Sequence, residues 1–226
     1  MKLLSAFFIN LFFLSVMPSM AQSNDYVAHE RDFGHYTTLI VDVQANIEVD
    51  ASQPSHGTLV VSEADFENLK WELLGETLII SAKEGKSLAG PINLKLGSPN
   101  LARIESTHES IIYMHHVNGE SLSLDLLKGT VKLEGKVENL HVMAEKGRLY
   151  GSGLESKSAE VRIWDEGSVV IHATESLEIE ATNNGRVIYN GSPSKVTKST
   201  SSGGVIMSEE ALQQQQREVE YVNFGV

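Results

Sequence analysis

Three consecutive stretches of the chain decide the fold: GTVKLEGKVENLHVMAEK (129–146), GRLYGSGLESKSAEVRIWDE (147–166) and GSVVIHATESLEIEATNN (167–184). Each begins with a glycine and contains two runs in which every second side chain is apolar. One run follows this glycine, and the other precedes the glycine of the next stretch. A period of two indicates β-strands, and similarity at a nearly fixed interval indicates a repeat architecture. The sequence therefore predicts short strands that recur in every unit.

The same unit extends over residues 101–208. The turn residue that starts each unit serves as its marker. The markers are Ser110, Gly129, Gly147, Gly167, Gly185 and Gly203, and they are separated by 19, 18, 20, 18 and 18 residues. The apolar residues two positions after the last five of these are expected to form one internal column: Val131, Leu149, Val169, Val187 and Val205.

A unit of this length cannot bury its apolar face alone and has no room for a crossover helix. We therefore expect an all-β fold, a right-handed parallel β-helix-like solenoid with about six coils of 18–20 residues. Antiparallel hairpins in a β-sandwich are the competing interpretation, because regularly spaced turns are typical of both architectures. Equal unit lengths and equivalent inward positions favour the solenoid.

The remaining segments are expected to surround this stack. Residues 33–100 contain short apolar runs without the same period, which predicts irregular strands that precede the solenoid and protect its edge. Residues 22–32 are expected to form a flexible N-terminal segment. Residues 209–226 are expected to cap the other end, with a short helix that follows Ser208 and a last strand over 219–224.

The first 21 residues, MKLLSAFFINLFFLSVMPSMA, have the pattern of a secretory signal peptide. Lys2 supplies the positive charge, an apolar run follows, and small residues precede the expected cleavage after Ala21. A membrane anchor is the alternative, but it needs about 20 apolar residues, and this run is shorter. We therefore expect an exported protein with no stable membrane insertion after cleavage.

Composition narrows the classes of function. The chain has 18 Lys and Arg against 30 Asp and Glu, a net charge of −12, so its surface would repel phosphates and no nucleic-acid partner is expected. The absence of cysteine excludes disulfides and thiolate metal ligands. The sequence also lacks the GxSxG, HExxH and P-loop motifs, which weighs against an enzyme.

Several stretches resemble the bacterial domain family described as putative auto-transporter adhesin, head GIN domain. They are TTLIVDVQANIEVD (37–50), LKWELLGETLIISAK (69–83), PINLKLGSPNLARIEST (91–107) and the coil endings GRLYGSG, GRVIYNGSP and SSGGVIM. The likeness covers residues 33–208 and includes a Tyr-x-Gly-x-Pro pattern at 189–193. The resemblance implies an exported β-helix-like protein of a Gram-negative bacterium, in the periplasm or at the cell surface. It carries no functional residues over to this chain.

The eight histidines raise the question of a metal site. His108, His115 and His116 fall close together in one coil, and His115 is expected to point outward beside Glu134 of the next coil. That pair is half of a zinc or copper site, and no third ligand is expected within reach. A solvated polar ladder explains the same residues, so neither a metal site nor a cofactor is predicted.

A β-helix enzyme that acts on polysaccharide is the alternative function, and it would need a pair of carboxylates on one face. The acidic candidates are Asp125, Glu134, Asp165 and Glu180. They fall at different positions of the repeat and are not expected to converge, so no catalytic residue is assigned.

The outward position three residues after each marker forms a candidate binding stripe. Its members are Tyr113, Lys132, Tyr150, Val170, Ile188 and Ile206. The later members are apolar, and an apolar stripe on a solvated face can mark a docking surface. The alternative is that the C-terminal segment or the first-half strands cover it. We expect a non-enzymatic, adhesin-like envelope protein that presents this stripe to a protein, a glycan or a second copy of itself.

Overall fold

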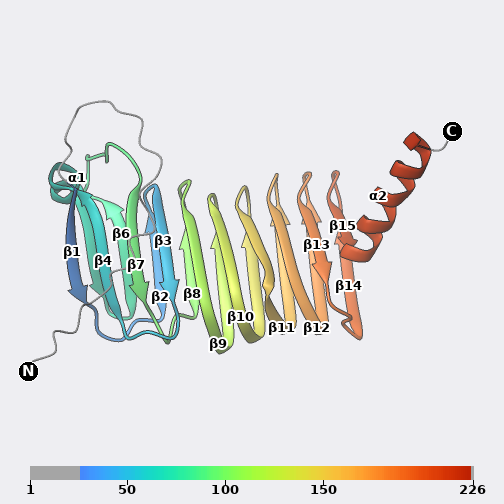
Figure 1. The fold of residues 1–226 in the computed structure, drawn as a ribbon, viewed down its shortest axis with the longest axis horizontal. Helices are drawn as coiled ribbons and strands as arrows, with labels where there is room; N and C mark the ends of the chain where they lie inside the picture. Colours follow the sequence, from blue (N-terminus) through green and yellow to red (C-terminus); the bar gives the residue numbers. More distant parts are fainter. Residues whose placement is uncertain (1–25, 225–226) are drawn as a thin grey trace, which may run out of the picture.

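The computed structural model describes residues 26–224, and these residues form mainly β-strands arranged in one elongated stack (Figure 1). The strands are β1 (Tyr26–Asp32), β2 (Thr38–Asp42), β3 (Ala45–Asp50), β4 (His56–Ser62), β5 (Leu69–Leu74), β6 (Thr77–Ala82), β7 (Ile92–Gly97), β8 (Arg103–Ser106), β9 (Ile111–Leu126), β10 (Thr130–Ala144), β11 (Arg148–Trp164), β12 (Ser168–Thr182), β13 (Arg186–Asn190), β14 (Lys195–Thr200) and β15 (Val205–Ser208). The helices are α1 (Glu63–Asn68) and α2 (Glu209–Phe224). Neither of these two described helices has the length and hydropathy needed to cross a membrane.

The long strands β9 to β12 form the centre of the stack, and each divides between two faces. The first half of β9 pairs with β3 and its second half with β8, both in parallel. At the other end, β12 pairs with β13 through residues 168–172 and with β14 through residues 176–181. We call the side with β3 and β13 the first face and the side with β8 and β14 the second face. Parallel pairing of successive units confirms the predicted all-β solenoid of about six turns and excludes the antiparallel sandwich.

The predicted internal column is present in the middle coils. Its paired members are Val131, Leu149, Val169 and Val187, and all four are buried. The prediction is wrong for Val205, because Ile206 pairs with Val187 instead.

The register changes at the last corner, which is one residue longer than the marker spacing predicts. Ser202 and Gly203 both have positive φ, 51° and 85°, and form the turn. Gly204 therefore packs against the coil before it: a Cβ added there would lie 2.0 Å from the carbonyl oxygen of Ala181. Only glycine permits such a close approach, and Val205 consequently turns outward.

The first half contributes coils to the same stack, so its strands are more regular than expected. Strands β2 and β3 form a coil that pairs in parallel with β8 and β9. Strands β6 and β7 pair in parallel with the other side of β2 and β3. The β2–β3 coil thus lies between β6–β7 and β8–β9, and spatial order differs from chain order. Antiparallel pairs made by β1, β4 and β5 cover the N-terminal end, which agrees with the expected edge protection.

Both ends of the described chain differ from the sequence prediction, while the segment predicted as a signal peptide (1–21) and residues 22–25 lie outside the described residues. Residues 26–32, part of the segment expected to be flexible, form β1 and pair with β4 along its whole length. The strand expected over 219–224 belongs instead to α2. The helix begins as expected, with the Ala211 amide donating to Ser208 Oγ over 3.2 Å. It continues because the following residues include neither glycine nor proline up to Phe224.

Candidate functional site

One row of outward side chains runs along the first face, and we call it the outer row. Its members, in spatial order, are Glu48, Tyr113, Lys132, Tyr150, Val170, Ile188 and Met207. Five of the six residues predicted for the binding stripe therefore lie together, about 4.8 Å apart from strand to strand. Ile206 does not join them, since it lies in the internal column and Met207 takes its place.

The part of the outer row nearest β3 is a closely paired polar group. The Tyr113 hydroxyl donates to Glu134 Oε2 over 2.6 Å, and Lys132 Nζ lies 2.7 Å from Glu134 Oε1. The same ammonium lies 4.7 Å from the centroid of the Tyr113 ring, which is the geometry of a cation–π contact. These contacts hold the two outer-row side chains in fixed positions over β9 and β10.

The carboxyl pKa of Glu134 lies below its ordinary value because Lys132 and, to a smaller extent, Tyr113 bond to its charged form. Replacing Lys132 by Met is expected to raise this pKa, so that the carboxylate is protonated at higher pH than in the wild type. NMR titration of the Glu134 carboxyl measures the change. The Tyr113→Phe variant is expected to show a smaller rise, and an unchanged titration in Lys132→Met would exclude the ion pair in solution.

Farther along the stack the outer row becomes apolar. Tyr150 is 51% exposed, whereas Val170, Ile188 and Met207 are half-buried. Helix α2 contacts β13 and β15, the strands that carry Ile188 and Met207. In Figure 1 the helix leads away from the end of the stack, and Tyr150, farther from it, is accessible.

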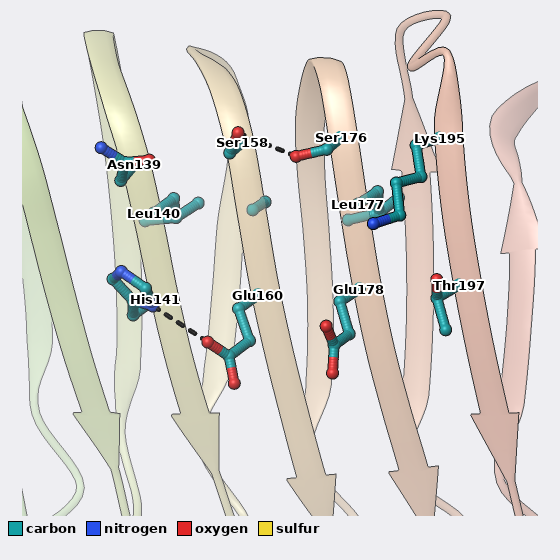
Figure 2. Close-up of a pocket in the computed structure, with 11 residues that line it drawn as sticks. Asn139, Leu140, His141, Ser158, Glu160, Ser176, Leu177, Glu178, Lys195 and Thr197 are labelled. Atoms are coloured by element: carbon teal, nitrogen blue, oxygen red, sulfur yellow. Dashed lines mark hydrogen bonds and ion pairs between the residues drawn. The ribbon is translucent and has the colours of Figure 1, made fainter.

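A polar groove of about 200 Å³ crosses the second face over β10, β11, β12 and β14 (Figure 2). Its polar side chains form two rows across the strands, Asn139, Ser158, Ser176 and Lys195 in one and His141, Glu160, Glu178 and Thr197 in the other. Ser176 Oγ donates to Ser158 Oγ over 2.8 Å, and His141 Nδ1 lies 3.3 Å from Glu160 Oε2. These groups pair along the rows, as a solvated polar ladder does.

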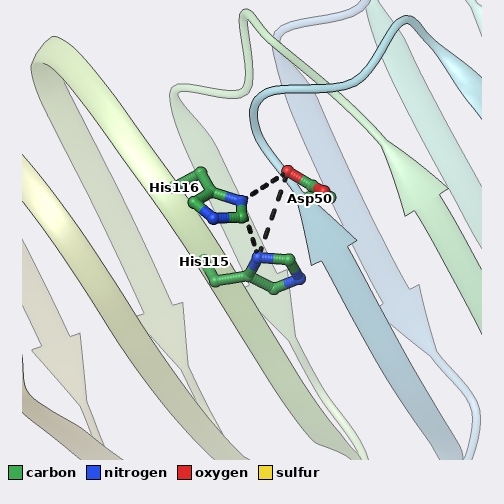
Figure 3. Close-up of side chains that lie close together, drawn as sticks. All are labelled: Asp50, His115 and His116. Carbon is green, nitrogen blue, oxygen red and sulfur yellow. Dashed lines mark hydrogen bonds and ion pairs between the residues drawn. The ribbon is translucent and has the colours of Figure 1, made fainter.

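His115 and His116 lie beside Asp50, a residue that the sequence analysis did not connect with them (Figure 3). His116 Nδ1 is 2.9 Å from both His115 Nδ1 and Asp50 Oδ1. Within the described residues, these three form a group whose ligand atoms are close enough to share one metal ion. His108 lies apart from them, with its Nδ1 3.0 Å from Asp42 Oδ1.

The prediction that His115 pairs with Glu134 assumed that β9 and β10 align without an interruption. This assumption is wrong at Glu134. The ladder between β9 and β10 shifts between Leu133 and Gly135, so both histidines lie opposite Glu134. The Glu134 carboxylate bonds to Tyr113 and Lys132 instead, while His115 pairs with Asp50 on the opposite side.

The acidic candidates for glycoside hydrolysis remain apart. Asp125 and Glu180 share one outward row, contrary to expectation, but they are three strands apart. Three strand spacings are about 14 Å, which exceeds the upper separation of about 9.5 Å for paired carboxylates in glycosidases. Asp165 pairs with Lys146 at 3.5 Å. The two acids that share a row, Asp125 and Glu180, are therefore too far apart to act as such a pair.

Two faces of parallel strands, with side chains aligned in rows along the outside, define a solenoid repeat protein. The chain belongs to the family described as "Putative auto-transporter adhesin, head GIN domain", whose model matches residues 35–193. This match confirms the resemblance found in the sequence. None of the curated proteins matches the chain.

Several solved structures are similar to this chain. A putative adhesin from Bacteroides fragilis is 16% identical over 82% of this chain and 98% of its own, with a TM-score of 0.62. A putative lipid binding protein from Parabacteroides distasonis is 17% identical over 82% of this chain and 97% of its own, with a TM-score of 0.49. The likeness to the first shows that the two chains share a fold.

Proposed function

We propose that this protein is an exported, non-enzymatic binding protein of the cell envelope, and that it binds a glycan along the outer row. The observation that carries the proposal is the position of Tyr150. Its half-exposed ring lies between the cationic Lys132 and the apolar Val170 on neighbouring strands. Tyrosine suits such a surface because the ring packs on apolar groups while the hydroxyl stays hydrogen-bonded to water or ligand.

Export and the absence of catalysis have separate support. The signal-peptide pattern at residues 1–21 and membership of an adhesin-like family support export to the periplasm or cell surface of a Gram-negative bacterium. The wide separation of Asp125 and Glu180 supports a role without glycoside hydrolysis. A solenoid with a continuous row of outward side chains is suited to an extended ligand, because each coil adds an equivalent contact.

Glycan-array binding beside an assay of reducing-sugar release tests this function. We expect binding without release, and we expect the double variant Tyr150→Ala, Val170→Lys to bind at least about 10-fold more weakly, because it removes an aromatic contact and introduces a charge. Met143→Lys is the matched control, since Met143 is 40% exposed on the second face.

Sugar release by the wild type would contradict the non-enzymatic role. An equal loss of binding in Met143→Lys would contradict the assignment to the first face. The array could also show no glycan binding by the wild type. A protein partner is then indicated if the wild type and Met143→Lys capture a defined envelope protein and the double variant does not.

A further inference from the structure

A β-bulge in β9 turns two consecutive histidines toward β3. His115 and His116 lie opposite the single residue Glu134 of β10, so β9 contains one extra residue at this point. His116 has a φ of 59°, in the left-handed region that residues other than glycine rarely adopt. Such strained backbone is concentrated at functional sites. In Figure 3 both imidazoles point toward Asp50 at the end of β3.

Three basic atoms meet where the bulge faces β3. They are Nδ1 of His115, Nδ1 of His116 and Oδ1 of Asp50. A hydrogen bond between the two Nδ1 atoms requires a proton on one of them, since each is otherwise a lone-pair acceptor. A metal cation can replace that proton and accept lone pairs from all three atoms, because metal ligands are the deprotonated forms.

Neighbouring groups orient these three atoms. Glu48 Oε1 lies 3.4 Å from Nε2 of His115, and a carboxylate at this nitrogen favours the tautomer that leaves Nδ1 free to bind a metal. Asp50 Oδ1 accepts from the backbone amide of Ser52 over 2.9 Å and from its hydroxyl over 2.7 Å. These two bonds from Ser52 hold the Asp50 carboxylate in place.

The distances among the three atoms distinguish between metal geometries. They are 2.9 Å, 2.9 Å and 4.0 Å, with the longest between His115 Nδ1 and Asp50 Oδ1. For metal–ligand bonds of about 2.05 Å, adjacent corners of a square are about 2.9 Å apart and opposite corners about 4.1 Å, whereas all corners of a tetrahedron are about 3.3 Å apart. The three atoms therefore match three corners of a square rather than of a tetrahedron; this T-shaped set occurs in square-planar and tetragonal sites, which nitrogen and oxygen ligands give with Cu²⁺ or Ni²⁺, and also in octahedral ones.

We propose that Asp50, His115 and His116 form a divalent-metal site that prefers Cu²⁺. Copper is the strongest binder in the order of first-row divalent ions, and the square arrangement adds to that preference. The site is open to solvent, because the His116 side chain is 62% exposed and Asp50 also lies in the wall of an open groove of about 500 Å³. Water or a ligand atom of a bound molecule completes the coordination.

Titration of the tag-free protein with Cu²⁺ against a competing chelator tests the site. We expect one high-affinity equivalent and an electron paramagnetic resonance spectrum with coupling to two imidazole nitrogens. His116→Asn is expected to weaken Cu²⁺ binding by at least about 100-fold and to remove one nitrogen coupling. Asparagine tolerates the left-handed backbone, so this variant preserves the bulge. Asp50→Asn is expected to weaken binding by a similar factor while both nitrogen couplings remain.

The matched control is His108→Asn, because His108 is also exposed and also lies beside an aspartate. It should bind Cu²⁺ with the affinity and spectrum of the wild type. Thermal unfolding of each variant in the presence of chelator shows whether it is folded. Wild-type affinity in folded His116→Asn and Asp50→Asn, or a loss in His108→Asn equal to theirs, would overturn the proposal.

Discussion

Leu149→Asp is expected to abolish the folded state. Leu149 is 1% exposed in the internal column, between Val131 and Val169 of the adjoining coils. Truncating a buried leucine costs about 2–5 kcal/mol, and burying an unpaired carboxyl group adds to that cost. The total cost approaches the free energy of unfolding of an ordinary domain, which is about 5–15 kcal/mol. Urea denaturation followed by circular dichroism measures the loss.

Tyr150→Asp is the control for this substitution, one residue farther along the same strand. The two side chains point to opposite sides of β11, and Tyr150 is 51% exposed. An aspartate at this position keeps its hydration, so the expected loss of stability is below about 1 kcal/mol. Similar losses for the two variants would contradict the inward and outward alternation on which the solenoid depends.

Gly135→Ala is expected to lower the free energy of unfolding by about 3 kcal/mol or more. Gly135 has a φ of +135°, and a Cβ added there would lie 2.2 Å from the carbonyl oxygen of Val117 in the neighbouring coil. The substitution therefore combines a backbone conformation that disfavours any side chain with a clash against backbone that cannot rotate away. Chemical denaturation of the purified variant provides the measurement.

Gly119→Ala supplies the comparison, because Gly119 is in the adjacent long strand and a Cβ there meets nothing within 4 Å. Its stability is expected to stay within about 0.5 kcal/mol of the wild type. A neutral Gly135→Ala would show that β9 and β10 are farther apart at the bulge than the structure has them.

The repeat region was the most predictable part of the fold, because one physical signal recurs in it. Each coil shows the same alternation of apolar and polar residues. The number of residues from the corner glycine was therefore enough to align Val131, Leu149, Val169 and Val187. The alignment failed at the final coil, where two glycines are consecutive. The interval between repeats cannot show whether Gly203 or Gly204 is the one that approaches the neighbouring backbone.

The residues around Asp50 were not predictable in the same way. Asp50 and His115 are adjacent only because β3 pairs with β9, and nothing in the local pattern of either strand specifies that long-range pairing. The bulge was equally hidden, since His116 carries no sequence signal for a left-handed backbone. The outer row, by contrast, followed directly from the repeat for five of its seven members; Glu48 comes from β3, outside the repeat, and Met207 takes the place expected for Ile206.

The position of the β2–β3 coil constrains the order in which the stack can be assembled. This coil emerges early, yet one of its sides is completed by β6–β7 and the other only when β8 and β9 are synthesised. The stack therefore cannot form by adding each new coil to one growing end in chain order, because the coils on both sides of β2–β3 come later in the sequence. Until residue 115 is available, one side of that coil presents unpaired backbone, which makes an incomplete chain prone to pair with another copy.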